Sequence, residues 1–374
     1  MTKRIWSLVI KDFTHLVRDW WLPAFMLFGG MLELLLIGWA TSRPITNLPI
    51  MILDQDQTTA SRKLISGLEN TTTFSINHFA ATFDEIENAM DRGSINAAII
   101  IPNNYGADIE AHNGNPTIAA ILNGAESTAA IVALRSIEGL IAEIGMDITI
   151  EQLGLPEEAL AGFIPSLRVW FNEALNEALY TTPAELGLML EFTILIFAAL
   201  SFSREREMGT LEQLLVMPFS SLEIIAGKSI PVIIIGFVDF VLLGGIVIFA
   251  FNVPVRGSVG LLLLLALIYI FVELGKGLVI SVSSKTQHQA FLIVMLVGMV
   301  DFLFTGYAVP VESMPPILQI ISNLIPAHHW LVILRGILLK GVGLETLWPN
   351  VIALIILGIV IGSISIVFVR RSLD

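Results

Sequence analysis

The sequence predicts an α-helical polytopic membrane protein with six transmembrane helices, plus a mixed α/β extracytoplasmic domain between helices one and two. The first observation is composition: 55% of the 374 residues are hydrophobic and 14% are charged, against about a quarter in soluble domains. The second is a set of six apolar segments of about twenty residues, the length that spans a bilayer as a helix. The third is charge: residues 42–181 hold eighteen Asp and Glu against six Lys and Arg, which is a net −12 of the total −13.

Composition also excludes several functional classes. Because the chain contains no cysteine, disulfide scaffolds, thiolate zinc sites, iron–sulfur clusters and a cysteine nucleophile are ruled out. The net charge of −13 opposes binding to a nucleic-acid backbone, whose phosphates are neutralised by Lys and Arg. The lipid bilayer is therefore an expected partner, and nucleic acid is not.

The apolar segments divide the chain. The second segment contains Glu185 and Glu191, and acidic residues are uncommon in a membrane span. The predicted spans are 22–40, 184–202, 230–251, 259–280, 290–309 and 351–369. The predicted parts are a cytoplasmic interfacial helix (1–21), transmembrane helix 1 (22–41), the acidic α/β domain (42–181) and a five-helix transmembrane domain (182–374).

Loop charges set the predicted orientation, because Lys and Arg in short loops stay on the cytoplasmic side. With six spans, the following basic residues all fall on one side: Lys3, Arg4, Lys11, Arg18, Arg204, Arg206, Lys228, Lys285, Arg370 and Arg371. The prediction is a multi-pass protein of the bacterial cytoplasmic (inner) membrane. Both termini are then cytoplasmic, and residues 42–181 and 310–348 lie outside.

The N-terminal region allows two interpretations of the first span. A cleaved signal peptide is the alternative to an uncleaved anchor, but about twenty residues precede the apolar run, which is long for such a peptide. We therefore favour the anchor. Apolar residues such as Trp6, Val9 and Phe13 among basic ones predict an interfacial amphipathic helix before it; alternatively, this stretch holds only the topology signal.

Between the first two spans, short β-like runs alternate with helical stretches, which predicts a small α/β domain. Asp54 and Asp56 follow the first strand and are candidates for binding a cation, although a solvated acidic surface is the favoured interpretation and no metal site is assigned. The predicted strands cover 49–53, 74–79, 97–101 and 118–122, and the predicted helices cover 58–69, 83–92 and 126–152.

Residues 203–229 form a patterned loop on the predicted cytoplasmic side. Leucines recur at helical spacing over 211–215, Pro218 ends that helix, and a second helix is expected to begin at Ser221. The loop is too short for a domain and too patterned for a linker. It therefore predicts a docking element, with a solvated loop lying on the lipid headgroups as the alternative.

One short stretch of the sequence is similar to part of a nucleotide-binding motif. Gly227–Lys228–Ser229 looks like the end of a phosphate-binding loop, but the motif needs a glycine where this chain has Leu222. The intervening residues also fit a helix rather than a flexible loop. The chain is therefore predicted not to be an enzyme, with no catalytic residues and no ATPase site of its own.

Two motifs carry a resemblance to a known family. The first is REREMGTLEQLLVMP over 204–218, followed by EIIAGK over 223–228. The second is PVESMPP over 310–316, followed by Ile325–Pro326 and by LRGILLKGVG over 334–343. Both resemble the permease subunits of type-2 ABC exporters, in the multidrug-efflux-like branch, and the layout of one span, a large external domain and five further spans is similar too.

The resemblance implies half of an exporter. Two permease subunits, identical or related, would pair in the membrane, and each would dock a separate ABC ATP-binding subunit, which binds the ATP and Mg; no cofactor is expected in this chain. A periplasmic adaptor protein is a further candidate partner. The implied coupling residues are Arg204, Glu205, Arg206, Glu207, Gly209, Thr210, Glu212, Gln213 and Pro218. The implied re-entrant helices of the external gate, over 310–348, include Pro310, Glu312, Pro315, Pro326 and Arg335.

Acidic residues inside the predicted spans are candidates for lining a translocation path. They are Glu33, Glu191, Asp239 and Asp301. A charge at the bilayer centre costs roughly 2.5–3.5 kcal/mol on insertion scales, so such groups normally face protein or water. For Asp239 and Asp301, a proton site is a second functional interpretation, and hydrogen bonding between helices, with or without the acid protonated, is the favoured alternative. Glu273 and Lys276 lie three residues apart on one helix and are expected to pair.

The predicted function is that of a permease subunit of an ABC exporter. It would form the path for ATP-driven efflux of a small or amphipathic substrate, drug-like or lipid-like, across the cytoplasmic membrane. One alternative is a membrane-anchored extracytoplasmic binding or sensing module, which has no need of the patterned loop. Another is an intramembrane enzyme, but the spans contain no H-E-x-x-H, G-x-S-x-G or paired-Asp motif.

Overall fold

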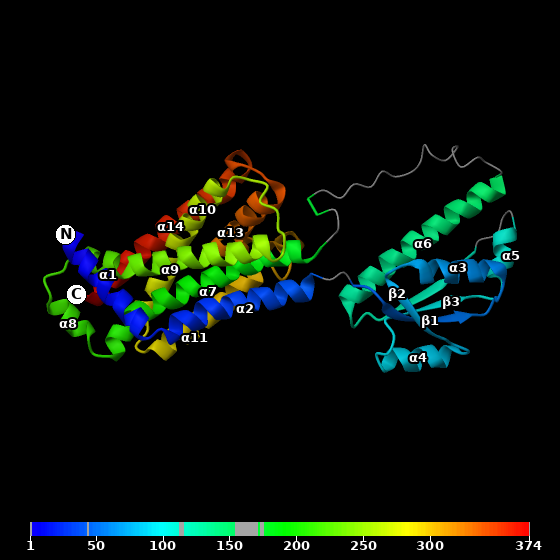
Figure 1. The fold of residues 1–374 in the computed structure, drawn as a ribbon, viewed down its shortest axis with the longest axis horizontal. Helices are drawn as coiled ribbons and strands as arrows, with labels where there is room; N and C mark the ends of the chain where they lie inside the picture. The colour runs from blue at the N-terminus through cyan, green and yellow to red at the C-terminus, as the bar shows by residue number, and fades with distance from the viewer. Residues whose placement is uncertain (1, 43–44, 112–115, 154–170, 173–175, 374) are drawn as a thin grey trace. The chain divides into compact units, whose positions relative to one another are not determined.

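The structure is a computed structural model that describes every residue except 1, 43–44, 112–115, 154–170, 173–175 and 374. The chain divides into two compact units. One comprises Met1–Arg43 with Val169–Asp374 and is helical; the other comprises Pro44–Arg168 and contains a sheet (Figure 1). We call these the helical unit and the α/β unit and describe each by itself.

Among the described residues, six helices of the helical unit are long and apolar enough to cross a membrane, and each overlaps one of the six predicted spans. They are α2 (Trp21–Thr41), α7 (Ala178–Glu207), α9 (Ser221–Phe249), α10 (Val259–Ser283), α11 (Gln287–Phe304) and α14 (Leu344–Leu373). The α11 helix ends five residues before the predicted end at 309. Gly306 adopts a left-handed conformation there (φ 87°), which stops the helix.

The α7 and α10 helices form the centre of the helical unit. They are the most buried of the six, whereas α2 and α14 are mostly exposed on their outer faces. Gly277 of α10 allows the close approach, because a Cβ there would lie 2.4 Å from the Cβ of Ala198 in α7. The central position of α7 explains its two acidic residues, since both Glu185 and Glu191 face protein.

Serine or threonine side chains cap the N-termini of several of these helices. Ser220 and Glu223 form a reciprocal capping box at the start of α9, with a Ser220 Oγ to Glu223 N distance of 3.3 Å. Residues 222–229 therefore lie in the first turns of α9, as the sequence predicts. The Ser258 and Thr286 hydroxyls cap α10 and α11 by accepting the backbone N–H of Leu261 and Gln289, without a reciprocal bond.

The segment after α11 is broken into short helices. Residues Val311–Ser313 form η3, followed by α12 (Pro316–Ser322), α13 (Pro326–Arg335) and the π-helix η4 (Gly336–Lys340). The axis bends by 83° between Pro316–Ser322 and Pro326–Lys340. The break near Pro326 is as predicted, but α13 begins at this proline because proline is well tolerated in the first helical turn.

The N-terminal helix α1 (Thr2–Arg18) packs against α9, with Leu8 and Val9 buried. Its other face exposes Trp6 and Val17. The helix is therefore amphipathic, as the sequence predicts. Figure 1 shows that α1, α8 and the C-terminus of α14 lie at the same end of the helical unit, away from α13.

The α/β unit is a four-stranded mixed sheet with strand order β2-β1-β3-β4. The strands β1 (Leu48–Asp54), β2 (Phe74–Phe79) and β3 (Ala97–Ile101) are parallel, and β4 (Ala119–Leu122) runs antiparallel to β3. The helices are α3 (Thr59–Asn70), α4 (Phe83–Asp91), α5 (Tyr105–Glu110) and α6 (Ser127–Leu153).

Two apolar cores lie on the two faces of this sheet. Alternate residues of β1 point to opposite sides: Ile50 and Ile52 pack with α3 and α6, whereas Met51 and Leu53 pack with α4. Figure 1 shows α3 and α6 on one side of the sheet and α4 on the other. The strands and three of the helices match the predicted ranges to within two residues. The short helix α5 was not predicted.

Candidate functional site

The patterned loop joins α7 to α9 at the end of the helical unit that also holds both termini. After α7 ends, Gly209 turns the chain in a left-handed conformation (φ 69°), which a residue with a Cβ would adopt only under strain. A short helix, α8 (Leu211–Val216), follows. Leu211 and Leu214 are buried beneath it, as their spacing predicts.

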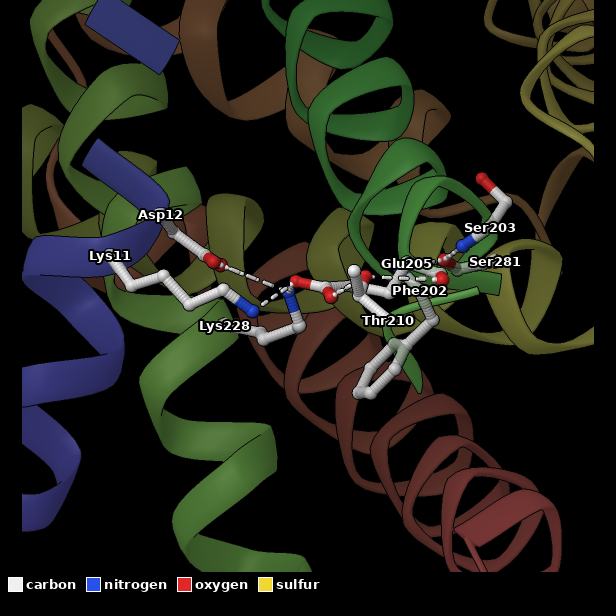
Figure 2. A network of polar contacts seen from close by, with 8 residues as sticks. All are labelled: Lys11, Asp12, Phe202, Ser203, Glu205, Thr210, Lys228 and Ser281. Carbon is white, nitrogen blue, oxygen red and sulfur yellow. Dashed lines mark hydrogen bonds and ion pairs between the residues drawn. The ribbon is translucent and has the colours of Figure 1, made fainter. Parts of the chain in front are cut away.

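A network of charged side chains lies beneath the loop (Figure 2). Glu205 Oε1 accepts hydrogen bonds from Lys11 Nζ at 2.7 Å and from Lys228 Nζ at 3.1 Å. Lys228 Nζ also contacts Asp12 Oδ2 at 3.2 Å, and the Thr210 hydroxyl donates to Glu205 Oε2. Two cations therefore balance two carboxylates, and they come from α1, α7 and α9. We call Lys11, Asp12, Glu205 and Lys228 the base network.

The other charged residues at the end of α7 also bond within the chain. Arg204 pairs with Asp19, while Arg206 donates to the carbonyl of Val282 at 3.0 Å and to the Ser372 hydroxyl at 2.9 Å. Arg206 also donates to the carbonyl of Ser284. Glu207 accepts the backbone N–H of Gln287 at 2.7 Å. These contacts tie the loop to the adjacent ends of α10, α11 and α14.

The nine predicted coupling residues thus fall into two groups. Arg204, Glu205, Arg206, Glu207 and Thr210 hold the loop in place. Gly209, Glu212, Gln213 and Pro218 are exposed. Pro218 also accepts a hydrogen bond from Arg4 through its carbonyl, at 2.8 Å.

Three exposed apolar residues of the loop were not selected from the sequence. Met208, Val216 and Met217 are 57%, 87% and 50% exposed. The sequence could have indicated Val216, because the helical spacing of Leu211 and Leu214 defines the inward face of α8 and Val216 falls outside that face. We call Met208, Gly209, Glu212, Gln213, Val216, Met217 and Pro218 the exposed loop face.

A second polar site lies between the central helices. Lys276 Nζ of α10 is 2.6 Å from Asp301 Oδ2, 2.7 Å from Glu273 Oε2 and 3.2 Å from Glu191 Oε1. The Tyr269 hydroxyl lies 3.3 Å from Glu191 Oε2. We call these five residues the Lys276 cluster. The predicted pairing of Glu273 with Lys276 is confirmed.

The structure does not bring the four path candidates together. Glu191 and Asp301 meet at Lys276, but Asp239 lies apart on α9, 1% exposed and with Thr193 as its polar neighbour. In the described part of the chain, neither carboxylate oxygen of Asp239 has a partner at hydrogen-bonding geometry. Glu33 is exposed on the surface of α2.

At the opposite end, one predicted gate residue joins several elements. Arg335 of α13 donates to the carbonyl of Tyr180 at 3.2 Å and to that of Gly306 at 3.5 Å. Its guanidinium stacks 3.7 Å from the Tyr180 ring centroid, so α13 is tied to α7 and to the end of α11. The remaining gate candidates take turn positions: Pro310 precedes η3, Glu312 is exposed within it, Pro315 precedes α12, and Pro326 opens α13.

In the α/β unit, Asp54 and Asp56 stabilise local turns. Asp54 accepts from the backbone N–H groups of Asp56 and Gln57 at 3.1 and 3.0 Å, and Asp56 accepts from Gly106 N at 3.0 Å. Burial, with a smaller contribution from the Asp56 carboxylate, raises the pKa of the Tyr105 phenol. This arrangement agrees with a local structural role for both carboxylates.

Comparison with known proteins identifies the family. Residues 20–367 match the family model described as ABC-2 family transporter protein. The chain is 27% identical over its whole length to the whole of a probable multidrug ABC transporter permease, YbhR, of Escherichia coli. It is 25% identical to a second such permease, YbhS, and to the inner membrane transport permease YhhJ of the same organism; each match covers at least 99% of this chain and 98% of the relative. The chain therefore belongs to the ABC-2 family of transporter permeases.

Proposed function

We propose that this chain is the membrane half of an ATP-driven exporter. In this proposal a separate ABC subunit hydrolyses ATP, and the permease pairs with a second permease, identical or related. Together the two permeases move a small or amphipathic substrate outward across the cytoplasmic membrane. The observation that carries the proposal is the exposed loop face, mounted on a base that several membrane helices hold in place.

The base network explains how a docked motor would act on the membrane helices. Glu205 and Lys228 are 7% and 3% exposed, and buried charges that lose their partner are strongly destabilising. The loop therefore cannot shift alone without breaking these pairs. A push on the loop face would move α1, α7 and α9 together, and Arg206 and Glu207 would extend the movement to α10 and α11.

The proposed orientation across the membrane depends on the side on which the exposed loop face lies. ATP is cytoplasmic, so the loop face must be cytoplasmic for this function. The predicted loop charges support that side, because Arg204 and Arg206 lie in the last turn of α7 and Lys228 near the start of α9. Figure 1 shows α8, which joins these two helices, at the same end of the helical unit as both termini. The α/β unit and the broken helices α12 and α13 would then lie outside.

A pocket beside the base network supports an amphipathic substrate or lipid. Its walls come mainly from α1, α7 and α9, with Leu22 of α2 and Gln287 of α11, and most of their surface is apolar, including Leu16, Phe197 and Val232. Lys11, Asp12 and Glu205 lie on its polar side, and the buried Ser201 hydroxyl, also in the lining, has no partner among the described residues. Such a lining suits a molecule with one polar end and an apolar body.

The docking proposal is tested with the double variant Glu212→Lys/Val216→Asp. Val216 has no polar side-chain atom, and the Glu212 carboxylate makes no hydrogen bond with the described residues. The permease should therefore insert and fold normally. The variant should bind the ATP-binding subunit at least about tenfold more weakly, which corresponds to about 1.4 kcal/mol, because it reverses a rim charge and charges an apolar contact. Co-purification and ATP turnover in nanodiscs measure the effect.

The matched control is Glu87→Lys, which reverses an exposed charge on α4 of the α/β unit. It should leave both measurements unchanged. Normal co-purification and normal ATP turnover by the loop variant would show that the loop does not dock the motor.

A further inference from the structure

The Lys276 cluster places more acidic groups than basic ones at the centre of the helical unit. Three carboxyl groups lie within 3.2 Å of one ammonium, and they come from three helices: α7, α10 and α11. Glu191 and Glu273 are fully buried, and the Lys276 side chain is 15% exposed. With every group ionised, the cluster would carry a net charge of −2.

A net charge of −2 is unfavourable among side chains that are this deeply buried. Removing an ion from water costs several kcal/mol even after the protein relaxes, and only a well-paired counter-charge offsets the loss. One ammonium can offset one carboxylate. The two remaining carboxyl groups have no second cation, so protonation is the simplest way for them to stay neutral.

No other described group supplies that second cation. On α9, Asp239 faces Thr193 rather than the cluster. On α13, Arg335 faces Tyr180, and His329 hydrogen-bonds with Asn350 and Asn323. The α14 helix meets α10 at Ile361 and Gly362, which are uncharged.

The three carboxyl groups differ in their contacts with Lys276. Asp301 makes the shortest contact, at 2.6 Å, and accepts a hydrogen bond from Lys276 Nζ. Glu191 accepts a longer hydrogen bond, 3.2 Å, from the same nitrogen, and another from the Tyr269 hydroxyl at 3.3 Å. Glu273 Oε2 is 2.7 Å from Nζ, but at an unfavourable angle, and neither Glu273 oxygen receives a hydrogen bond from the described residues. Asp301 therefore has the closest contact with the cation, and its side chain is also the most exposed of the three, at 9%.

We propose that the Lys276 cluster is a proton-binding site, in which Asp301 is the carboxylate paired with Lys276 and Glu191 and Glu273 each hold a proton. Release breaks a carboxyl O–H bond, leaves a carboxylate and transfers the proton to water. Because that carboxylate needs solvent or a cation, release requires water to enter between α7, α10 and α11. The site therefore links the separation of these helices to a change in protonation.

Infrared spectroscopy of the full-length protein in phospholipid nanodiscs at about pH 7 tests the proposal. The background is Glu185→Gln/Asp239→Asn, which removes the other buried acids near mid-bundle. A protonated carboxylic acid has a carbonyl absorption separate from that of a carboxylate. We expect this band in the background protein. Glu191→Gln and Glu273→Gln should each remove about half of it, and the two together should remove all of it.

Isotope labelling gives a second measurement that needs no change within the cluster. Carbon-13 in the glutamate carboxyls should shift the band, whereas carbon-13 in the aspartate carboxyls should leave it in place. The matched control Glu212→Gln, at an exposed position, should not alter the band. Absence of the band, or a band that follows the aspartate label, would overturn the proposal. Failure of either glutamine variant to fold would also contradict it, because an amide resembles a neutral acid.

Discussion

At the scale of single residues, burial decides which lysine of the base network contributes more to the stability of the fold. The Lys228 side chain is 4% exposed and pairs with both Glu205 and Asp12, whereas the Lys11 side chain is 35% exposed. Removing a buried partner leaves an uncompensated charge and costs roughly 3–5 kcal/mol, against about 1 kcal/mol or less for an exposed one. Lys228→Met should therefore lower thermal stability far more than Lys11→Met, as measured by unfolding in detergent.

The double variant Lys228→Met/Glu205→Gln serves as the control for that prediction. It removes the buried cation together with its main partner, so it should recover part of the lost stability. Equal effects of the two lysine substitutions would mean that the network contributes only surface charge.

Asp239 is a buried acidic residue that, unlike those of the base network, has no cation beside it among the described residues. A buried polar group whose hydrogen bonds are unmade costs about 1–3 kcal/mol, and within the described chain Asp239 has only Thr193 as a polar neighbour. We therefore expect Asp239→Asn to keep or raise thermal stability while changing the rate or substrate range of transport. Transport assays and melting curves on the same preparation separate the two effects. Unchanged transport by the folded variant would remove Asp239 from the mechanism.

At the scale of elements, the sequence predicts the helices and strands well because periodicity and apolar length are local properties. The strands 74–79 and 97–101 coincide with β2 and β3, and the start of α9 at Ser221 follows from its capping pair. The partners of a charged side chain are not local. Glu191 and Asp301 are 110 residues apart, and only the packing of α7, α10 and α11 brings both to Lys276. Likewise, the sequence selected Arg204 and Glu205 for docking, but tertiary contacts turn them inward.

The contact between α7 and α10 provides a test at the same scale. A Cβ at Gly277 would lie 2.4 Å from Ala198 Cβ and 3.2 Å from the Leu195 carbonyl, so Gly277→Ala should force the two helices apart. Overpacking of this kind typically costs about 1–3 kcal/mol. Gly245→Ala in α9 is the matched control, because nothing lies within 4 Å of its added Cβ. Alanine favours a helix by up to about 1 kcal/mol over glycine, so the control should be neutral or stabilising. Equal melting temperatures for the two variants would show that α7 and α10 do not pack this closely.

At the scale of the whole molecule, the six candidate spans and the loop charges predict one arrangement across the membrane. An even number of spans would put both termini on one side, and the basic residues favour the cytoplasm for that side. Because the chain has no cysteine, each position can be labelled from a clean background. Glu87→Cys on the surface of α4 and Gln213→Cys on the exposed loop face are both exposed and should react alike in detergent. In intact cells, an impermeant thiol reagent should label Glu87→Cys and leave Gln213→Cys unmodified until the membrane is permeabilised. Labelling of Gln213→Cys from outside would invert the orientation, and it would place the loop face where no ATP-driven motor can reach it.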